Sequence, residues 1–300
     1  MDMNISDIKK SCLKKWCNGE ARLDERLEFF SKEFESWLQQ IPESNQTTVI
    51  TLIEHLEYHS HRTTNTCLKN LHSELVKYTN ITDDNTIYVF IKSEDGISNS
   101  SNDYWTEYKL INNLNKNICI ENMESIAPEA WLYIQNFVFI DDFCGSGKSF
   151  INELKKDPER YKNKNVFFIT IHAMMQAFDS VRLYCSKAGI NIILLSAFTQ
   201  DKAFEQNYFE DNALAKNEVM NMSKILNIPK SARMGYDDSQ SLVAFYNNTP
   251  NNTLGFIRYD TENYKSIFPR RKDHIPQWQV MTKRSHRRSM ANYNNKLNGI

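Results

Sequence analysis

The sequence lacks the features that would place the protein in a membrane or in an oxidising compartment. It has six cysteines in 300 residues, and no two of them form a C-x-x-C pair, which argues against a disulfide framework and against a zinc site. No apolar run approaches the roughly 18 residues of a membrane-spanning helix. The first residues lack the basic and apolar parts of a signal peptide. These absences predict a cytoplasmic protein with no membrane association.

An excess of one charge is also missing. The chain has 36 Lys and Arg against 37 Asp and Glu, so its formal net charge of −1 argues against a generic nucleic-acid binder. There is no internal repeat, and the apolar and charged fractions of 41% and 24% are those of a soluble globular protein. The length allows one large domain or two modest ones with a sizeable core.

One stretch, FVFIDDFCGSGKS at 137–149, carries most of the chemical information. Its apolar residues 137–140 predict a buried strand, Asp141 and Asp142 follow, and a Gly/Ser turn leads into a helix near Ser149. A strand, a tight turn and a helix N-terminus form an anion site, because backbone N–H groups converge there and the helix dipole favours negative charge. We therefore expect a phosphate at this turn. The candidate phosphate-binding residues are Gly145, Ser146, Gly147, Lys148 and Ser149.

The same turn partly fits the phosphate loop of nucleoside triphosphatases, G-x-x-x-x-G-K-[ST]. Gly147, Lys148 and Ser149 match its end, but the first glycine should stand at position 142, which is Asp142. Two adjacent carboxylates inside a triphosphate cradle would repel the ligand, so this assignment is disfavoured.

The stretch resembles the PRPP-binding motif of type I phosphoribosyltransferases: an apolar strand, two acids, two variable residues, two small residues, Gly, any residue, then Thr or Ser. It departs from that motif at Gly145-Ser146, where Thr-Thr is usual, and in the added Lys148. The resemblance implies that the acids hold the ribose hydroxyls, often with Mg²⁺, and that the loop holds the 5′-phosphate. It makes Asp141 and Asp142 the candidate catalytic residues. The other interpretation is a buried strand that ends in an ordinary Asx-rich turn.

Strands and helices alternate after residue 85, which predicts an α/β fold with a mostly parallel sheet and flanking helices. The carboxyl ends of such strands form the ligand-binding edge, and Lys92, Asp141, Asp142 and His172 all follow or end strands. The resemblance makes Lys92 and Ser93 candidates for a pyrophosphate loop. His172 is a candidate for base recognition or for capping its helix. The predicted strands span residues 86–91, 137–140, 165–171 and 190–195.

Residues 1–82 show apolar positions at helical spacing and predict an all-helical N-terminal region. This region would cap the α/β domain or dock a partner. His55 and His59 are spaced i, i+4, but no third ligand accompanies them, so we expect a solvated helix end and no metal site made of side chains alone.

The α/β domain is predicted to span residues 85–262, and it contains an amide-rich loop at 247–253. Amides offer both a donor and an acceptor and can read the edge of a base, so Asn251 and Asn252 are base-recognition candidates. Together with the acidic motif, Thr-Pro-Asn-Asn-Thr-Leu at 249–254 resembles the phosphoribosyltransferase-like domains of bacterial conflict systems, some of which accompany retron reverse transcriptases. This resemblance implies an effector of anti-phage defence with partner proteins.

The C-terminal segment, 263–300, is basic. Between Tyr264 and Lys296 it has nine Lys or Arg and one acid, which suits binding of nucleic acid or an acidic partner, or a solvated tail. Arg270 and Arg271 would alternatively reach the phosphate site.

Two functions follow from the sequence. In one, the protein is an enzyme that binds PRPP or a nucleotide, with Mg²⁺ bridged by the ligand, makes or breaks a ribose C1 bond, and is toxic when released by its partners. In the other, the fold is a nucleotide-sensing or scaffold module that binds nucleic acid or proteins.

Overall fold

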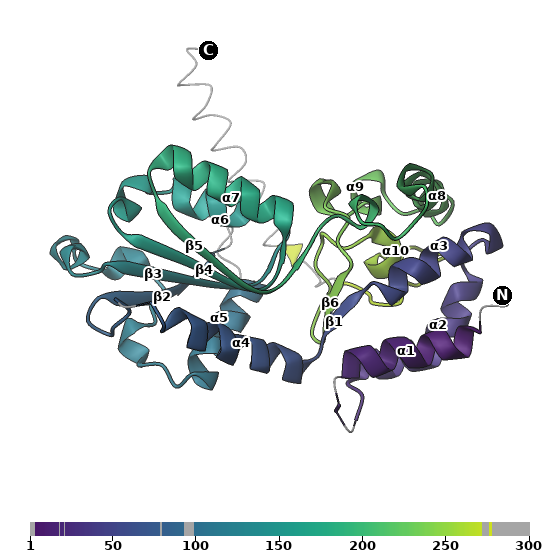
Figure 1. The fold of residues 1–300 in the computed structure, drawn as a ribbon, viewed down its shortest axis with the longest axis horizontal. Helices are drawn as coiled ribbons and strands as arrows, with labels where there is room; N and C mark the ends of the chain where they lie inside the picture. Colours follow the sequence, from purple (N-terminus) through teal and green to yellow (C-terminus); the bar gives the residue numbers. More distant parts are fainter. Residues whose placement is uncertain are drawn as a thin grey trace, which may run out of the picture.

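The computed structural model describes residues 4–17, 19–20, 22–78, 80–92, 99–271 and 276–277. The chain folds into a lobe built on a sheet and a mostly helical lobe (Figure 1). Among the described residues, no helix is long and apolar enough to serve as a membrane span.

Four parallel strands form the main sheet in the order β2–β3–β4–β5. The register runs across all four strands, with Ile87 beside Phe137, Phe137 beside Val166, and Val166 beside Ile192. This arrangement confirms the predicted α/β class with a parallel sheet. The strands are β2 (Thr86–Phe90), β3 (Asn136–Cys144), β4 (Asn165–Met174) and β5 (Asn191–Gln200).

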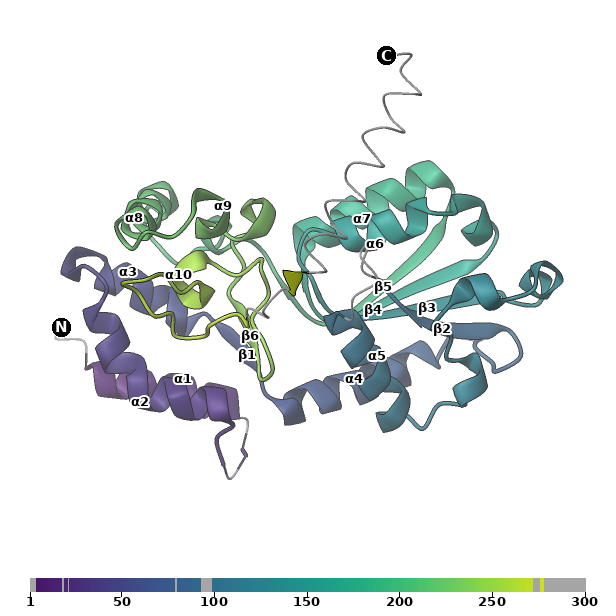
Figure 2. The same cartoon turned by 180° about the vertical axis from the view of Figure 1, so that it is seen from behind.

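Helices cover both faces of this sheet (Figures 1 and 2). Along β3, Val138 and Ile140 point into the core under α4 and α5, whereas Phe137 and Phe139 point into the core under α6 and α7. The alternation follows from the two-residue period of a strand, and the strand is apolar on both faces because both are covered. The helices are α4 (His61–Leu75), α5 (Ser100–Ile111), α6 (Lys148–Lys155) and α7 (Met175–Ala188).

The second lobe joins the two ends of the chain around one aromatic core. The rings of Trp16, Phe30 and Phe268 lie within 4.8–5.6 Å of one another, and the Trp37 indole donates to the Tyr264 hydroxyl at 2.8 Å. The elements of this lobe are α1 (Ile5–Cys17), α2 (Glu25–Gln39), α3 (Glu43–Glu54), α8 (Asn212–Ile225), α9 (Lys230–Arg233), α10 (Gly255–Arg258), β1 (Glu57–His59) and β6 (Val243–Phe245).

The N-terminal region is helical as predicted, apart from strand β1, which pairs with β6 in parallel. This pairing places His59 in a strand, where it is 1% exposed, so the expected solvated helix end is wrong for this residue. Its ring lies beside His172 of β4, with Nε2 3.0 Å from Nδ1, and burial lowers the pKa of His59 to about 3. No cluster of three metal-ligating side chains occurs in the part of the chain that the structure describes.

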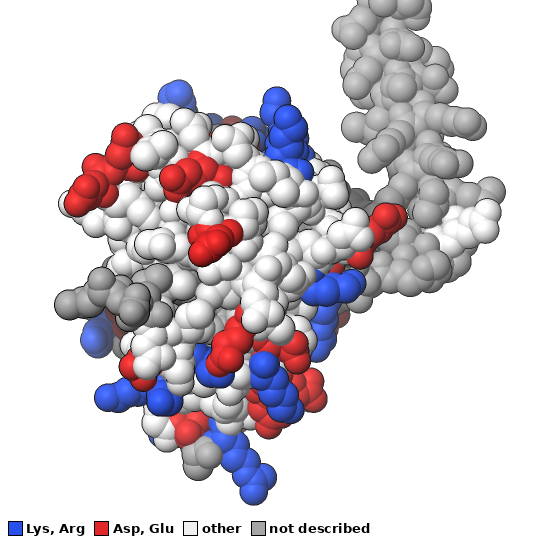
Figure 3. Space-filling view, turned by 90° about the vertical axis from the view of Figure 1, so that its right-hand side faces the viewer, with Lys and Arg blue, Asp and Glu red and all other residues white. Residues whose placement is uncertain are grey.

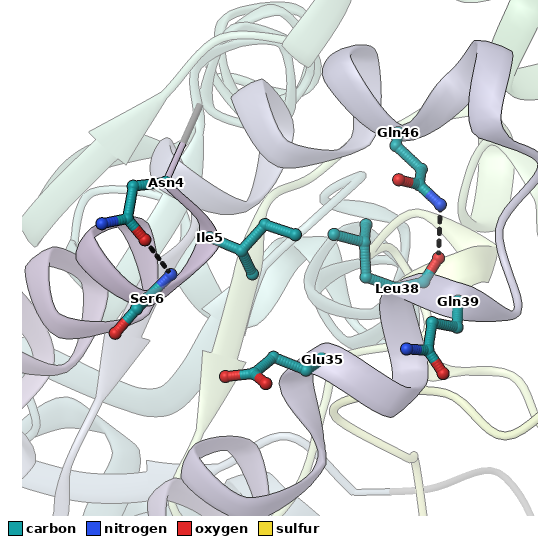
Figure 4. Close-up of a pocket in the computed structure, with 7 residues that line it drawn as sticks. All are labelled: Asn4, Ile5, Ser6, Glu35, Leu38, Gln39 and Gln46. Carbon is teal, nitrogen blue, oxygen red and sulfur yellow. Dashed lines mark hydrogen bonds between the residues drawn. The ribbon is translucent and has the colours of Figure 1, made fainter. Parts of the chain in front are cut away.

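The outer face of the helical lobe carries acidic and basic side chains interspersed with one another (Figure 3). Among its described residues this face has no continuous basic surface of the kind that nucleic acid favours. A surface pocket of about 440 Å³ between α1 and α2 also lies in this lobe (Figure 4). Its one ionised group, Glu35, is paired with Lys9 at 2.7 Å, so the pocket offers little for recognising a ligand.

Candidate functional site

The two acids lie on β3 itself, because the strand continues to Cys144 instead of ending at Ile140. The ladder with β4 extends through Asp141, which stands beside Thr170. The backbone N–H of Asp142 donates to Asp141 Oδ1 at 3.0 Å. The Asp142 carboxylate accepts from the Ser100 side chain at the start of α5 and from the Phe143 N–H. The pair is therefore held rigidly by the end of the sheet.

Burial sets the electrostatics of this acidic pair. It raises the pKa of Asp141 well above its ordinary value, and the neighbouring charge of Asp142 raises it further. Burial also raises the pKa of Asp142, while the hydrogen bonds that its carboxylate accepts work in the opposite direction. Among the described residues no Lys or Arg forms an ion pair with either carboxylate, so the pair favours a shared proton, a cation or the hydroxyl donors of a ligand.

The turn after the acids depends on two glycines. Gly147 has φ 73°, and a Cβ there would lie 2.9 Å from the Ala177 carbonyl oxygen on α7. A Cβ on Gly145 would lie 2.2 Å from the side chain of Asn252. The turn thus packs tightly against α7 on one side and against the amide-rich loop on the other.

Backbone N–H groups of this turn are free to bind an anion. Within the described part of the chain, no protein acceptor is hydrogen-bonded to the N–H of Ser146, Ser149 or Phe150. Helix α6 begins here at Lys148, and its N-cap residue Gly147 has no side chain to cap it, so the positive end of the helix dipole faces the same space. Lys148 adds a cation, which forms an ion pair with Asp237 at 2.8 Å. The arrangement suits a phosphoryl group.

The acids and the turn line one cavity of about 820 Å³ between the two lobes. One wall comes from the sheet lobe, from β3, the turn and the start of α5. The facing wall comes from the helical lobe. The residues of that facing wall are Tyr236, Asn247, Asn248, Thr249, Pro250, Asn251, Asn252, Arg270 and Arg271.

The family model described as PRTase-CE matches residues 34–270 of the chain. The protein belongs to the PRTase-CE family. The resemblance to phosphoribosyltransferases expected from the acidic motif is thereby confirmed at the level of the family.

One similar solved structure is the Helicobacter pylori xanthine-guanine-hypoxanthine phosphoribosyltransferase, with 13% sequence identity and a TM-score of 0.31. The match covers 49% of the PRTase-CE chain and 92% of the Helicobacter chain. The comparison with curated proteins finds no match.

The PRTase-CE cavity gathers most of the residues singled out in the sequence. The two acids, the five turn residues, Asn251 and Asn252 all line it. Lys92 is absent from the lining residues, and its amine donates to Asn122 at 3.2 Å. Ser93 lies outside the described residues, as do Lys272 and the basic run at 283–288.

His172 stands apart from this cavity. It is 1% exposed, and it borders a smaller cavity of about 340 Å³ above β4 and β5. Burial lowers the pKa of His172 well below its ordinary value, and the charge of His59 lowers it further. The two rings therefore form a neutral pair inside the protein.

The start of α5 contributes residues that the sequence patterns did not identify. Ser101 is 2% exposed, and its hydroxyl donates to the Ile140 carbonyl at 2.7 Å and accepts from the Ile91 N–H at 2.9 Å. It ties the ends of β2 and β3 together, while the preceding Ser100 reaches Asp142. The sequence did contain a signal for the start of this helix, the N-cap residue Asn99. Its side chain accepts from the Asn102 N–H at 3.1 Å.

Proposed function

We propose that this PRTase-CE protein binds a ribose 5-phosphate ligand, PRPP or a nucleotide, and makes or breaks the bond at ribose C1. The observation that supports this most directly is that the acidic pair and the free N–H groups of the turn line the same cavity. Such a ligand requires hydrogen-bond donors for its phosphate and, next to them, hydrogen-bond acceptors for its two ribose hydroxyls.

Binding would use complementary groups along the ligand. The N–H groups of Ser146, Ser149 and Phe150 would donate to the 5′-phosphate, since the α6 dipole favours negative charge at that point. Asp141 and Asp142 would accept from the ribose hydroxyls, and these donors would take the place of the shared proton that burial favours.

The reaction would proceed by separation of charge at C1. The bond from C1 to the pyrophosphate oxygen or to the base nitrogen breaks, and its electron pair leaves with that group. A base nitrogen or a water oxygen then forms the new bond to C1. Positive charge develops on C1 and the ring oxygen, where the carboxylates of Asp141 and Asp142 would stabilise it.

Mg²⁺ fits this site only together with a ligand. Asp141 and Asp142 provide hard oxygen donors, but no third acidic or histidine ligand joins them among the described residues. Mg²⁺ commonly binds through one or two carboxylates plus substrate phosphates and water. When bound, the ion would neutralise charge on the leaving pyrophosphate.

Base recognition is assigned to the amide-rich loop. Asn251 is exposed and lines the cavity, so its side-chain amide can meet the edge of a base. Asn252 is 6% exposed and packs against Gly145, while its Nδ2 donates to the Tyr236 carbonyl at 3.3 Å. Its role is to position the loop against the turn.

At the level of the cell, we propose that the protein is an effector of bacterial anti-phage defence. The support is its resemblance to the phosphoribosyltransferase-like domains of conflict systems. Turnover of a nucleotide or of PRPP would make such an effector toxic when its partners release it. If it binds the ligand without turnover, the module senses nucleotides.

Calorimetric titration of the purified protein with PRPP in Mg²⁺ tests the binding proposal. The double variant Asp141→Asn, Asp142→Asn is expected to lose about tenfold or more in affinity, because two charge-assisted hydrogen bonds are weakened. Asp179→Asn is the matched control, since that carboxylate is 69% exposed on α7 and pairs with Arg182. Equal affinity in the double variant and the control would refute the proposal.

Turnover is followed separately by ³¹P NMR of PRPP and of nucleotides incubated with the protein. Release of pyrophosphate or of ribose 5-phosphate by the wild type, but not by the double variant, supports the enzyme. Binding without any release identifies the sensing module instead.

A further inference from the structure

A third carboxyl group lines the cavity, apart from the acidic pair. Asp103 lies in α5, on the same wall as Asp141 and Asp142, and no other Asp or Glu is among the described residues that line the cavity. The three acids do not form a metal-binding cluster in the described ranges. In those ranges Asp103 also forms no ion pair with a Lys or Arg. Its carboxyl group is therefore available to a ligand.

The helix determines where this carboxyl group lies. Helix α5 begins with Ser100, whose side chain donates to the Asp142 carboxylate. Asp103 follows three residues later, and residues three apart lie on the same side of a helix with their Cβ atoms about 5–6 Å apart. The Asp103 side chain thus starts about one helical turn from the contact with Asp142.

The same side of α5 continues to the helical lobe. Glu107, one turn further along, accepts from the Tyr246 hydroxyl. Burial raises the pKa of Tyr246 to about 12, and the charges of Glu107 and Asp103 add to this effect. Tyr104 donates to Oδ1 of Asn247, a residue of the facing wall, at 3.0 Å. Asp103 therefore lies between the acids, where the ribose would bind, and the wall that would read the base.

Asp103 is also well suited to exchange a proton. Burial raises its pKa above the ordinary value of an aspartate, toward the range in which proton exchange is efficient. Two other groups of the cavity hold their protons more firmly. Burial raises the pKa of the Cys144 thiol well above its ordinary value, and the hydrogen bond to Asp237 raises the pKa of Lys148.

We propose that Asp103 is the general acid–base of the reaction and exchanges a proton with a ring nitrogen of the base. The proposal rests on the proposed function, in which the acidic pair acts on the ribose. When a nucleotide is cleaved, the C1–N bond breaks, its electron pair passes to the base, and the proton of the Asp103 carboxyl group goes to the ring nitrogen. A water oxygen forms the new bond to C1, and a proton of that water returns to the Asp103 carboxylate.

An acid at this position also has a purely structural use. Asp103 lies in the first turn of α5, where a negative charge interacts favourably with the helix dipole. A structural role alone predicts that Asp103→Asn lowers the melting temperature and slows every substrate of the folded protein to the same extent. A catalytic role predicts that the loss depends on the leaving group.

The test therefore compares leaving groups that differ in their need for a proton. The full chain with Mg²⁺ is incubated with the common nucleoside 5′-monophosphates, whose bases leave poorly as anions. The comparison substrates are nicotinamide mononucleotide and PRPP, because nicotinamide leaves as a neutral molecule and pyrophosphate leaves with Mg²⁺. Release of ribose 5-phosphate is followed by ³¹P NMR.

Asp103→Asn is expected to lower kcat for the nucleoside monophosphates by about 100-fold or more, and for the comparison substrates by less than about threefold. The affinity for the monophosphates, measured by calorimetry, should stay within about threefold. Asp103→Glu should retain part of the activity, since it keeps the carboxyl group. Added formate should raise the rate of Asp103→Ala, because formic acid can supply the missing proton. Asp179→Asn, on the exposed side of α7, is the control.

The outcomes separate this proposal from the proposed function. If the wild type cleaves the monophosphates and Asp103→Asn slows all substrates equally, or none, the proposal is refuted and the proposed function stands. Turnover of PRPP alone by the wild type also refutes it, because no base nitrogen then takes part. If the wild type cleaves only the monophosphates, the response of Asp103→Ala to formate decides. If it turns over no substrate, the proposed reaction itself fails.

Discussion

At the scale of single residues, the acidic pair is a place where function and stability oppose each other. Asp141 and Asp142 are adjacent on β3, and burial raises the pKa of both. A raised pKa means that the folded protein keeps a proton which the unfolded chain loses. Stability is therefore greatest below the ordinary pKa of an aspartate and falls as the pH rises through the raised one. The contribution of this pair to the free energy of unfolding should therefore be smallest at pH values above its raised pKa.

Asp141→Asn tests, in the absence of ligand, how much stability the protein loses when the acidic pair ionises. The amide has the same shape and no charge, so the variant should be more stable than the wild type at pH 8 and nearly equal to it at pH 4. A gain of 1 kcal/mol would raise Tm by about 2–4 °C in a protein of this size. The measurement is thermal melting across that pH range, with the exposed Asp179→Asn as control. A variant less stable than the wild type at pH 8 would contradict the electrostatic account.

At the scale of elements, the turn between β3 and α6 is the part of the site most sensitive to backbone changes. Gly147 combines φ 73° with a close approach to Ala177 and Val181 of α7, and it is the N-cap residue of α6. Its conformation determines where the N–H groups of Ser149 and Phe150 point. A change at Gly147 should therefore affect both stability and ligand binding.

Gly147→Ala is expected to destabilise the protein by about 2–4 kcal/mol. The left-handed conformation of an Ala costs about 1–2 kcal/mol, and the added Cβ must also displace the Ala177 carbonyl, 2.9 Å away. Gly189→Ala is a close control, because Gly189 ends α7 at φ 68° with no atom within 4 Å of a Cβ. Urea denaturation gives the loss in free energy of unfolding for both variants, and the difference between the two losses measures the contact with Ala177. Equal losses would show that the packing against α7 has no influence.

The strands also show how much of the fold sequence patterns can predict. Residues 137–140 predict a strand because four apolar residues can be buried on both faces of a covered sheet. The strand's last residues were missed, since the charged Asp141 and Asp142 interrupt the apolar run, and the ladder with β4 continues the strand through Phe143 and Cys144. Strand β1 was missed for a similar reason, because its partner β6 lies more than 180 residues away along the chain. The acidic motif is local and was predicted, whereas the wall of the cavity that faces it forms only after the chain has folded.

At the scale of the whole molecule, the N-terminal helices and the segment at residues 264–268 are parts of one core. Phe268 stacks on Phe30 with ring centroids 5.6 Å apart, and Tyr264 accepts from the Trp37 indole. Helix α4, also from the N-terminal region, covers one face of the sheet. Arg270 and Arg271, which line the cavity between the lobes, follow this shared core directly in the sequence.

A fragment of residues 83–271 should therefore fail to fold, although it contains every residue that lines the cavity. It lacks α1 to α4, and removing one buried Phe or Trp side chain typically costs 3–5 kcal/mol. Losing Trp16, Phe30, Phe34 and Trp37 together should cost about as much as, or more than, the roughly 5–15 kcal/mol that stabilises a typical protein. The measurement is a thermal melt and the dispersion of amide signals in an NMR spectrum, with residues 4–271 as the control that retains both lobes. A cooperative melt of the shorter fragment would mean that the sheet lobe folds independently, and that the helical lobe only adds the second wall of the site.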